Sequence, residues 1–268
     1  MKKILALVMT LTLVSGLVLT FGAVETYAAS GSYKLPTKIT QYEYKKGKWK
    51  KTDTYTYKYD SKGNITYWDG AKLKPTYKSG KLKKVVVTGN NDSGDKFITT
   101  KEYNAKGRIV SWGSTDPSGE AFYGFREYSY NSKGYIKKMQ PVTYPRNYAY
   151  KYYKNGLPKQ ITRSNLDDFD DYKIKVVEQY NKQGIETSGK RYEKGKLKSS
   201  WKKKITKKNG NITQIITTNN NGKKYKCVYT YGSAKTKSKK TYAAVMGMTQ
   251  GSLMFEAIGD NSAVGWCY

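Results

Sequence analysis

The stretch Tyr57-Lys58-Tyr59-Asp60-Ser61-Lys62-Gly63-Asn64-Ile65 decides the fold, because its pattern returns along the chain. An alternating run ends at a tyrosine, a short turn-like segment ends at a glycine, and an aliphatic residue starts the next run. Repetition of one short unit usually dictates an architecture. Long copies of the unit start at Tyr59, Tyr103 and Tyr130, and copies one residue shorter start at Tyr44, Tyr77 and Tyr192.

Each unit has the features of a β-hairpin. Tyr55, Tyr57 and Tyr59 alternate with polar residues, and successive side chains of a strand point to opposite faces. Asp or Asn can bond to its own backbone in a turn, and Gly accepts the positive φ that hairpin turns need. The long unit therefore predicts a loop of four or five residues, and the short unit predicts a tighter one.

The turn glycines recur from Gly47 to Gly222, and no segment in between carries a sustained helical pattern. We therefore predict an all-β protein, built as an extended antiparallel meander of repeated hairpins. The meander would form an open twisted sheet or a solenoid-like array, with almost no helix outside the N-terminal segment.

Residues 1–28 have the layout of a secretory signal peptide, with Lys2 and Lys3 before an apolar run and small residues near Ala28. The run is also about long enough for an uncleaved membrane anchor, and this alternative stays open. Either form exports the rest of the chain. We therefore predict a secreted bacterial protein, and the alternative is one that associates with the cell surface. Beyond the leader we predict a repeat domain at 32–232, a Lys-rich linker at 233–240 and a capping tail at 241–268.

The chain carries 50 Lys+Arg against 20 Asp+Glu, a net charge of +30, and only five of the basic residues are Arg. An excess of Lys favours diffuse attraction to anionic polymers, because Arg supplies the planar fork used in sequence-specific nucleic-acid recognition. The alternative is that the lysines keep an exposed sheet soluble and block edge-to-edge pairing. The chain has no His, the commonest general base and metal ligand, so we predict no catalytic residue, no metal and no cofactor.

The unit resembles the YD repeat of the Rhs family, most closely from Tyr57 to Ile65 and more loosely from Tyr128 and from Tyr180. The resemblance implies a β-strand repeat protein of bacterial surfaces, of a kind linked to carbohydrate binding or to wrapping a toxin domain. This chain departs from the family because it has no toxin domain and is too short to form a wrapping shell.

Four tryptophans lie in or just beyond the repeat turns and are candidates for contacts with a ligand: Trp49, Trp68, Trp112 and Trp201. Aromatic rings stack on sugars, but in every repeat they can equally supply the buried core.

Two further features carry chemistry. Cys227 and Cys267 are the only thiols of an exported chain, so they form a candidate disulfide; the alternative is an ordinary buried free cysteine. The acidic cluster at 167–171 offers carboxylates, yet it lacks the spacing of a calcium loop and is typical of a solvated loop.

Together these features predict an exported, non-enzymatic β-repeat protein that associates with an anionic or glycan surface such as a cell-wall polymer or mucin. Two alternatives remain open. One is a histidine-free glycoside hydrolase that uses carboxylates, and the other is a purely structural or adhesive module. No membrane contact is expected after removal of the leader.

Overall fold

The computed structural model describes residues 32–90, 94–119, 121–140, 146–165 and 173–251. The predicted signal peptide and the acidic cluster at 167–171 lie outside these residues. The chain from Tyr33 onward forms one compact unit, which is described here by itself.

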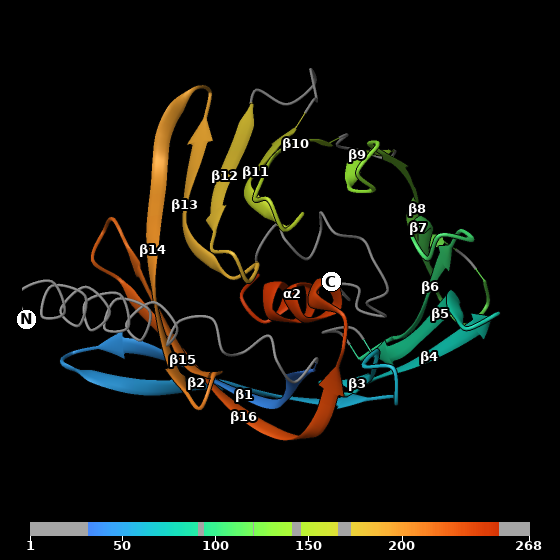
Figure 1. The fold of residues 1–268 in the computed structure, drawn as a ribbon, viewed down its shortest axis with the longest axis horizontal. Coiled ribbons are helices and arrows are strands. Elements are labelled where there is room, and N and C mark those ends of the chain that lie inside the picture. Colours follow the sequence, from blue (N-terminus) through green and yellow to red (C-terminus); the bar gives the residue numbers. More distant parts are fainter. Residues whose placement is uncertain (1–31, 91–93, 120, 141–145, 166–172, 252–268) are drawn as a thin grey trace, which may run out of the picture. The chain divides into compact units, whose positions relative to one another are not determined.

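Within the described residues the chain forms sixteen strands and one helix, α2 (Lys239–Met248). Each strand pairs antiparallel with the next, and the last strand pairs with the first, so the sheet closes into a barrel (Figure 1). The strands are β1 (Tyr33–Lys45), β2 (Lys48–Tyr59), β3 (Ile65–Trp68), β4 (Ala71–Lys78), β5 (Lys81–Asn90), β6 (Lys96–Tyr103), β7 (Ile109–Thr115), β8 (Ala121–Tyr130), β9 (Ile136–Gln140), β10 (Arg146–Tyr152), β11 (Pro158–Asn165), β12 (Ile174–Tyr180), β13 (Glu186–Glu193), β14 (Lys196–Lys208), β15 (Asn211–Asn219) and β16 (Lys224–Thr236).

The two lengths of the repeat are two types of hairpin loop, as predicted. In the short form, Lys46 and Gly47 have φ values of 49° and 78°, the pair of positive values that a type I′ turn requires. In the long form, the Asp60 carboxylate accepts hydrogen bonds from the backbone N–H groups of Lys62 and Asn64, both at 2.9 Å. The side-chain oxygen of Asn104 accepts the same two bonds in its own loop, so the long form uses an Asp or Asn as well as its glycine.

A β-bulge follows the loops, because the returning strand carries one extra residue. Tyr59 pairs with Ile65, but Lys58 pairs with Tyr67, so the residue between them has no partner on β2. Bulges increase the local twist of a sheet, and repeated twist bends a meander toward closure. The same shift occurs at Tyr77, Tyr103, Tyr130, Tyr180 and Tyr192.

Tyrosine hydroxyls tie each hairpin to a neighbouring segment. The Tyr59 hydroxyl donates to the Pro36 carbonyl at 2.7 Å, and the Tyr231 hydroxyl donates to the Ile212 carbonyl at 2.8 Å. Tyr150 donates to the carbonyl of Ile136 in the same way. A hydrogen bond of this kind contributes about 0.5–1.5 kcal/mol to stability. The recurring tyrosine is therefore a structural element of the barrel wall.

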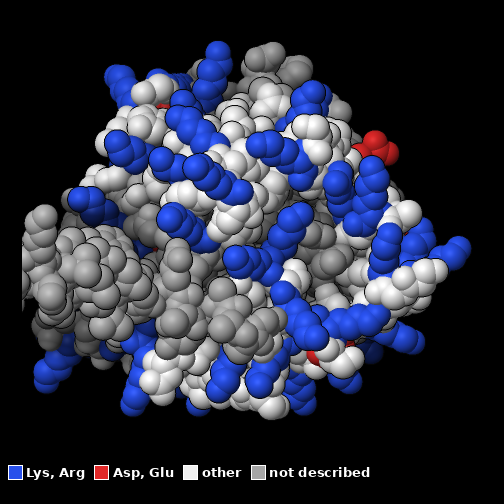
Figure 2. Space-filling model, in the orientation of Figure 1, with Lys and Arg blue, Asp and Glu red and all other residues white. Residues whose placement is uncertain are grey.

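The wall has a buried inner face and a basic outer face. Along β4, Ala71 and Leu73 are buried, whereas Lys72, Lys74 and Lys78 are exposed. Strand alternation produces this division directly from the sequence. Figure 2 shows Lys and Arg side chains spread over the visible face of the molecule, with very few acidic side chains between them.

Helix α2 lies inside the ring of strands (Figure 1). Ser238 caps its first turn by accepting a hydrogen bond from the Thr241 amide at 3.1 Å, and every residue from Thr241 to Met248 is buried. A helix buried on all sides must be enclosed by other elements. The Tyr242 ring stacks on Tyr33 of β1 with 4.9 Å between centroids. Among the described residues, no helix is long and apolar enough to cross a bilayer.

The prediction of an open sheet or solenoid is wrong, although the all-β class is correct. Strand β1 pairs with β16 from Tyr33 opposite Thr236 to Glu43 opposite Tyr225, so the array has no open ends. The segment expected to be a linker, 233–240, contains the end of β16 and the start of α2. The expected capping tail starts as this helix, and its residues 252–268 lie outside the described part of the chain.

Candidate functional site

A cavity of about 690 Å³ lies in the barrel lumen, beside the C-terminal end of α2. Its wall is formed by residues of β1–β3 and β12–β16, and Met248 to Gly251 close it on the helix side. Asp69 and Asn219 stand at or beside turns on the same edge of the barrel, so the cavity extends to that rim. Closure of the barrel is what brings these distant segments around one space.

Aromatic rings provide much of the lining, contributed by Tyr55, Tyr57, Trp68, Trp201 and Tyr225. Tyr57 is 5% exposed, and burial raises the pKa of its hydroxyl well above the usual value. The indole N–H of Trp68 is buried and forms no well-aligned hydrogen bond. It lies close enough to the Tyr57 hydroxyl to oppose part of that rise in pKa. The lining therefore combines aromatic surfaces with many polar side chains, among them Gln41, Thr52 and Asn219.

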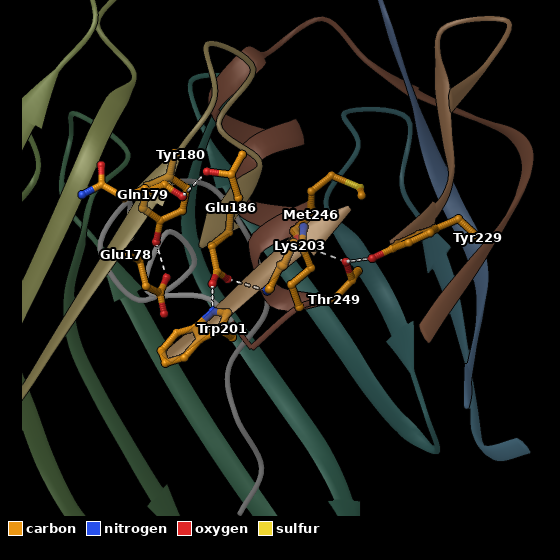
Figure 3. A network of polar contacts seen from close by, with 11 residues as sticks. Glu178, Gln179, Tyr180, Glu186, Trp201, Lys203, Tyr229, Met246 and Thr249 are labelled. Atoms are coloured by element: carbon orange, nitrogen blue, oxygen red, sulfur yellow. Dashed lines mark hydrogen bonds and ion pairs between the residues drawn. The ribbon is translucent and has the colours of Figure 1, made fainter. Parts of the chain in front are cut away.

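A buried ion pair crosses one side of the cavity wall (Figure 3). The Lys203 ammonium lies 2.5 Å from the Glu186 carboxylate, and the two side chains are 5% and 1% exposed. The Trp201 indole N–H donates to the other oxygen of Glu186, and Lys203 also donates to the Gln250 side-chain oxygen at 3.4 Å. These charged hydrogen bonds hold the side chains of Glu186, Lys203 and Trp201 in place, which fixes the geometry of this part of the wall.

Two further contacts complete the polar network in Figure 3. The Tyr180 hydroxyl donates to the buried carboxylate of Glu178. The hydroxyls of Tyr229 and Thr249 lie 3.3 Å apart, and Thr249 donates to the Met246 carbonyl at 2.8 Å. The second contact fastens the end of α2 to β16, so helix and wall hold the cavity open together.

Cys227 lines the same cavity, and burial raises the pKa of its thiol. Its thiol is free among the described residues, and Cys267 lies outside them. The disulfide between the two therefore stays a prediction.

The structure brings two of the four predicted tryptophans together. Trp68 and Trp201 line the cavity from opposite parts of the sheet. Trp112 is buried in the core, with the Arg126 guanidinium 4.4 Å from its ring. Trp49 lies on the β1–β2 hairpin, where its ring packs edge-on against Tyr44.

Sequence analysis missed the charged members of the site, Glu178, Glu186 and Lys203. A signal was present in the strand alternation. Glu178 lies two residues from Tyr180 and therefore shares its inner face, and Lys203 shares that face with Trp201. A charged residue in register with a buried aromatic row indicates a polar site within a core, because buried charges are rare unless paired.

No protein-family model and no curated protein matches the sequence. Among solved structures, a porin-like protein from Bacteroides vulgatus is similar, with 12% identity, a TM-score of 0.51, and coverage of 75% of this chain and 100% of that chain. A porin-like protein from Bacteroides uniformis has 13% identity and a TM-score of 0.49, with 74% and 96% covered. At this identity the likeness supports the barrel fold alone. It is compatible with a protein of the bacterial surface, and secretion stays a prediction.

The barrel also overturns the predicted function. A glycan- or polyanion-binding repeat protein built as an open sheet was expected, but the sheet is closed and Tyr57 and Tyr229 are buried inside it. The carbohydrate-binding YD-repeat protein that the resemblance implied conflicts with the same finding. The glycoside hydrolase and adhesive alternatives gain no support from the fold.

Proposed function

We propose that this protein is an exported, non-enzymatic container that binds a small amphiphilic molecule of lipid type in its lumen. The observation that carries the proposal is the cavity of about 690 Å³, whose lining combines aromatic rings with polar and charged side chains. Small-molecule sites are typically about 300–1,000 Å³ and use aromatic surface for contact area and polar groups for orientation. An apolar chain would pack against the rings, and a polar head would bond to the polar side chains.

The outer face supports a barrel that stands in water. Spanning barrels carry an apolar outer band, and a Lys near the middle of a bilayer costs about 2–4 kcal/mol. Strand β4 alone presents Lys72, Lys74 and Lys78 outward, so burying this strand in lipid would cost several kcal/mol. The apolar residues Ala71 and Leu73 of this strand point inward instead, which favours carrying an amphiphile over lying among lipids.

Helix α2 supports a container over a channel. Barrels of sixteen strands are wide enough to leave an aqueous channel when their lumen is empty. Here α2 lies within the lumen, packed against Tyr33 of β1 and bonded to Tyr229 of β16 through Thr249. The remaining space is a pocket of ligand size, closed on one side by the helix.

Binding of N-phenyl-1-naphthylamine, an uncharged apolar dye that fluoresces when shielded from water, tests the proposal. The protein is expected to bind the dye saturably, with a stoichiometry of about one per chain if this cavity is the site. The decisive variant is Thr217→Phe, since Thr217 lines the cavity and a phenyl group there would project into it and obstruct the dye. Dye binding is expected to fall at least about tenfold.

Thr218→Phe provides a matched control. Thr218 follows Thr217 on β15 and therefore points to the outer face. This variant is expected to bind the dye as the unmodified protein does. Absence of saturable binding to the unmodified protein would overturn the proposal, and so would equal binding by the two phenylalanine variants.

A further inference from the structure

The cavity contains two uncharged polar side chains that the protein itself does not use. Thr217 and Asn219 alternate on β15, are half-buried, and both line the cavity. Within the described part of the chain, neither side chain forms a hydrogen bond to another residue. A few well-placed polar groups fix the orientation of a ligand in a pocket, and these two groups are available for that purpose.

Asn219 differs from the residues at the same position of other long loops. It is the first residue of its loop, since its N–H donates to the Lys223 carbonyl at 2.9 Å and its carbonyl accepts from the Gly222 N–H at 3.0 Å. In corresponding loops the side-chain oxygen of the first residue accepts hydrogen bonds from the amides two and four residues later, as at Asp60, Asn104, Asn131 and Asn181. In this loop Asn221 replaces it, because the Asn221 Oδ1 accepts from the Lys223 amide at 3.1 Å. The turn therefore leaves the Asn219 amide group to the cavity.

Aromatic rings flank the two side chains. Asn219 pairs in register with Trp201 of β14, and Thr217 pairs in register with Tyr225 of β16. Both rings also line the cavity. Along the strand, Thr217 and Asn219 are about 7 Å apart, because alternate residues are separated by two rises of about 3.4 Å. A head group the size of glycerol can therefore bond to both side chains while its carbon atoms contact the rings.

The polarity of the cavity changes along β15. Tyr225, beside Thr217, is 38% exposed, whereas Ile215 is 2% exposed. Met248, where the helix closes the cavity, is 7% exposed. An amphiphile gains most when its apolar chain reaches the buried end and its head stays near water. This gradient orients a ligand with its head near the β15–β16 turn and its chain toward α2.

The charged groups nearest to this strand are already compensated. Lys203 pairs in register with Thr217, but its ammonium lies 2.5 Å from the Glu186 carboxylate, and both charged side chains are almost fully buried. The buried Glu178 carboxylate accepts a hydrogen bond from the Tyr180 hydroxyl. A charged head would therefore lose water here and meet charges that are already paired.

The other two charged residues of the lining lie away from β15. Lys226 is held on β16 with its ammonium 4.4 Å from the ring centre of Tyr42 on β1. Asp69 follows β3, and β16, β1 and β2 lie between β3 and β15 in the sheet. The surroundings of Thr217 and Asn219 therefore favour an uncharged polar head over an ion.

We propose that the cavity binds amphiphiles with an uncharged, hydroxyl-bearing head of glycerol type, and that Thr217 and Asn219 bind this head. The rings of Trp201 and Tyr225 enclose it on two sides. Each hydroxyl of such a head donates and accepts, so it matches the Thr hydroxyl and both ends of the Asn amide. This inference rests on the proposed function, because it names the class of ligand for the same cavity.

The test uses 1-monodecanoylglycerol and methyl decanoate, two uncharged esters with the same chain that differ only in the head, glycerol or methyl. Each is titrated below its aggregation or solubility limit against protein loaded with N-phenyl-1-naphthylamine. Monodecanoylglycerol is expected to displace the dye at a concentration about fivefold lower, because a site that bonds to hydroxyls discriminates against an analogue without them. Burial of apolar surface alone would give the reverse order, since methyl decanoate is the more apolar ester.

Decanoate and decyltrimethylammonium extend the test to an anionic and a cationic head on a ten-carbon chain. Each is expected to require a concentration at least about tenfold higher than monodecanoylglycerol, because its head would leave water for charges that are already paired. Attraction to the lysine-rich outer face would favour decanoate, so a surface effect cannot produce this order.

The double variant Thr217→Val with Asn219→Leu keeps the approximate volume of both side chains and removes their hydrogen-bonding groups. Its preference for monodecanoylglycerol over methyl decanoate is expected to disappear. The matched control is Gln214→Leu with Thr218→Val, which removes one amide and one hydroxyl from outward positions of the same strand and should keep the fivefold preference. In the unmodified protein, the glycerol protons of the bound ester are expected to show nuclear Overhauser contacts with the Tyr225 ring.

The outcomes separate this inference from the proposed function. Displacement by methyl decanoate, decanoate or decyltrimethylammonium at equal or lower concentration than monodecanoylglycerol would overturn the inference and leave the container intact. A preference that persists in the double variant, or contacts of the glycerol protons with Met248 in place of Tyr225, would overturn the assignment of the subsite. If the unmodified protein does not bind the dye at all, the proposed function itself is wrong.

Discussion

The ion pair between Glu186 and Lys203 is the contact whose removal should cost this barrel most. The pair is almost fully buried, with side chains 1% and 5% exposed and 2.5 Å between the charged atoms. Glu186→Gln keeps the volume and still offers an oxygen to the Trp201 N–H, so it removes little besides the charge. Breaking a buried pair from one side typically costs about 3–5 kcal/mol, because the remaining charge stays buried without compensation.

A second substitution separates the stability lost with the charge of Glu186 from the stability lost with its hydrogen bonds. Glu186→Leu also removes the acceptor of Trp201 and is expected to cost about 1–3 kcal/mol more. The double variant Glu186→Gln with Lys203→Met removes both charges and is expected to recover most of the loss, because neither charge is then left buried without its partner.

The measurement is urea denaturation followed by far-ultraviolet circular dichroism, with the slope of the transition checked for constancy. Glu43→Gln is the control, because Glu43 and Lys45 are also 2.5 Å apart but are 21% and 57% exposed. Exposed pairs contribute little, so its curve should overlay that of the unmodified protein. A Glu186→Gln variant as stable as this control would refute the argument that burial of the pair determines its effect.

Three further predictions concern the wall and its thiol. Gly189→Ala is expected to lower the unfolding free energy by about 1–3 kcal/mol and to weaken dye binding, because the new methyl group displaces the Trp201 ring. A variant as stable in denaturant as the unmodified protein would contradict this prediction. Burial raises the pKa of Tyr242 to about 12, so the unfolded chain releases this proton first. The contribution of Tyr242 to the unfolding free energy should therefore be fully present below pH about 10 and decline as pH rises toward about 12. An alkaline absorbance titration that is identical in the native and the urea-unfolded protein would exclude this contribution. If Cys227 and Cys267 are joined, intact mass after alkylation should show two modified thiols only after reduction, and alkylation without reduction would exclude the disulfide.

The local structure could be predicted from the sequence because it is set by contacts between neighbours in the chain. The turn at Asp60 and Gly63 needs only the carboxylate, two nearby amides and a residue that accepts positive φ. Alternation likewise places Tyr55 and Tyr57 on one face wherever the strand lies in the sheet. These features do not depend on how the array ends, so they hold for an open sheet and for a barrel alike.

Helix α2 shows why a helix could be missed. Amphipathic helices are recognised by a polar face, but all residues from Thr241 to Met248 are enclosed and none needs to face water. The signals present were Ser238 in a capping position and the run Ala243-Ala244-Val245 after it, which indicate a helix through capping and composition. Such a segment forms its helix inside the barrel, where the surrounding strands supply the packing.

Closure of the barrel depends on β1 and β16, which lie at opposite ends of the repeat array, and no local pattern encodes their pairing. The bulge after each loop adds twist in every repeat. Whether the two end strands come close enough to pair depends on the total twist of all strands. The cavity is a consequence of that sum, since Trp68 and Trp201 line one space only when β1 and β16 meet. The repeated tyrosine unit therefore specifies how the wall is built, whereas the binding site is specified by the inward residues that depart from the unit, a Glu and a Lys in register with aromatic rings. For a closed sheet of this kind, the search for function is best directed to charged residues at inward positions, because each of them would destabilise the core without a partner or a ligand.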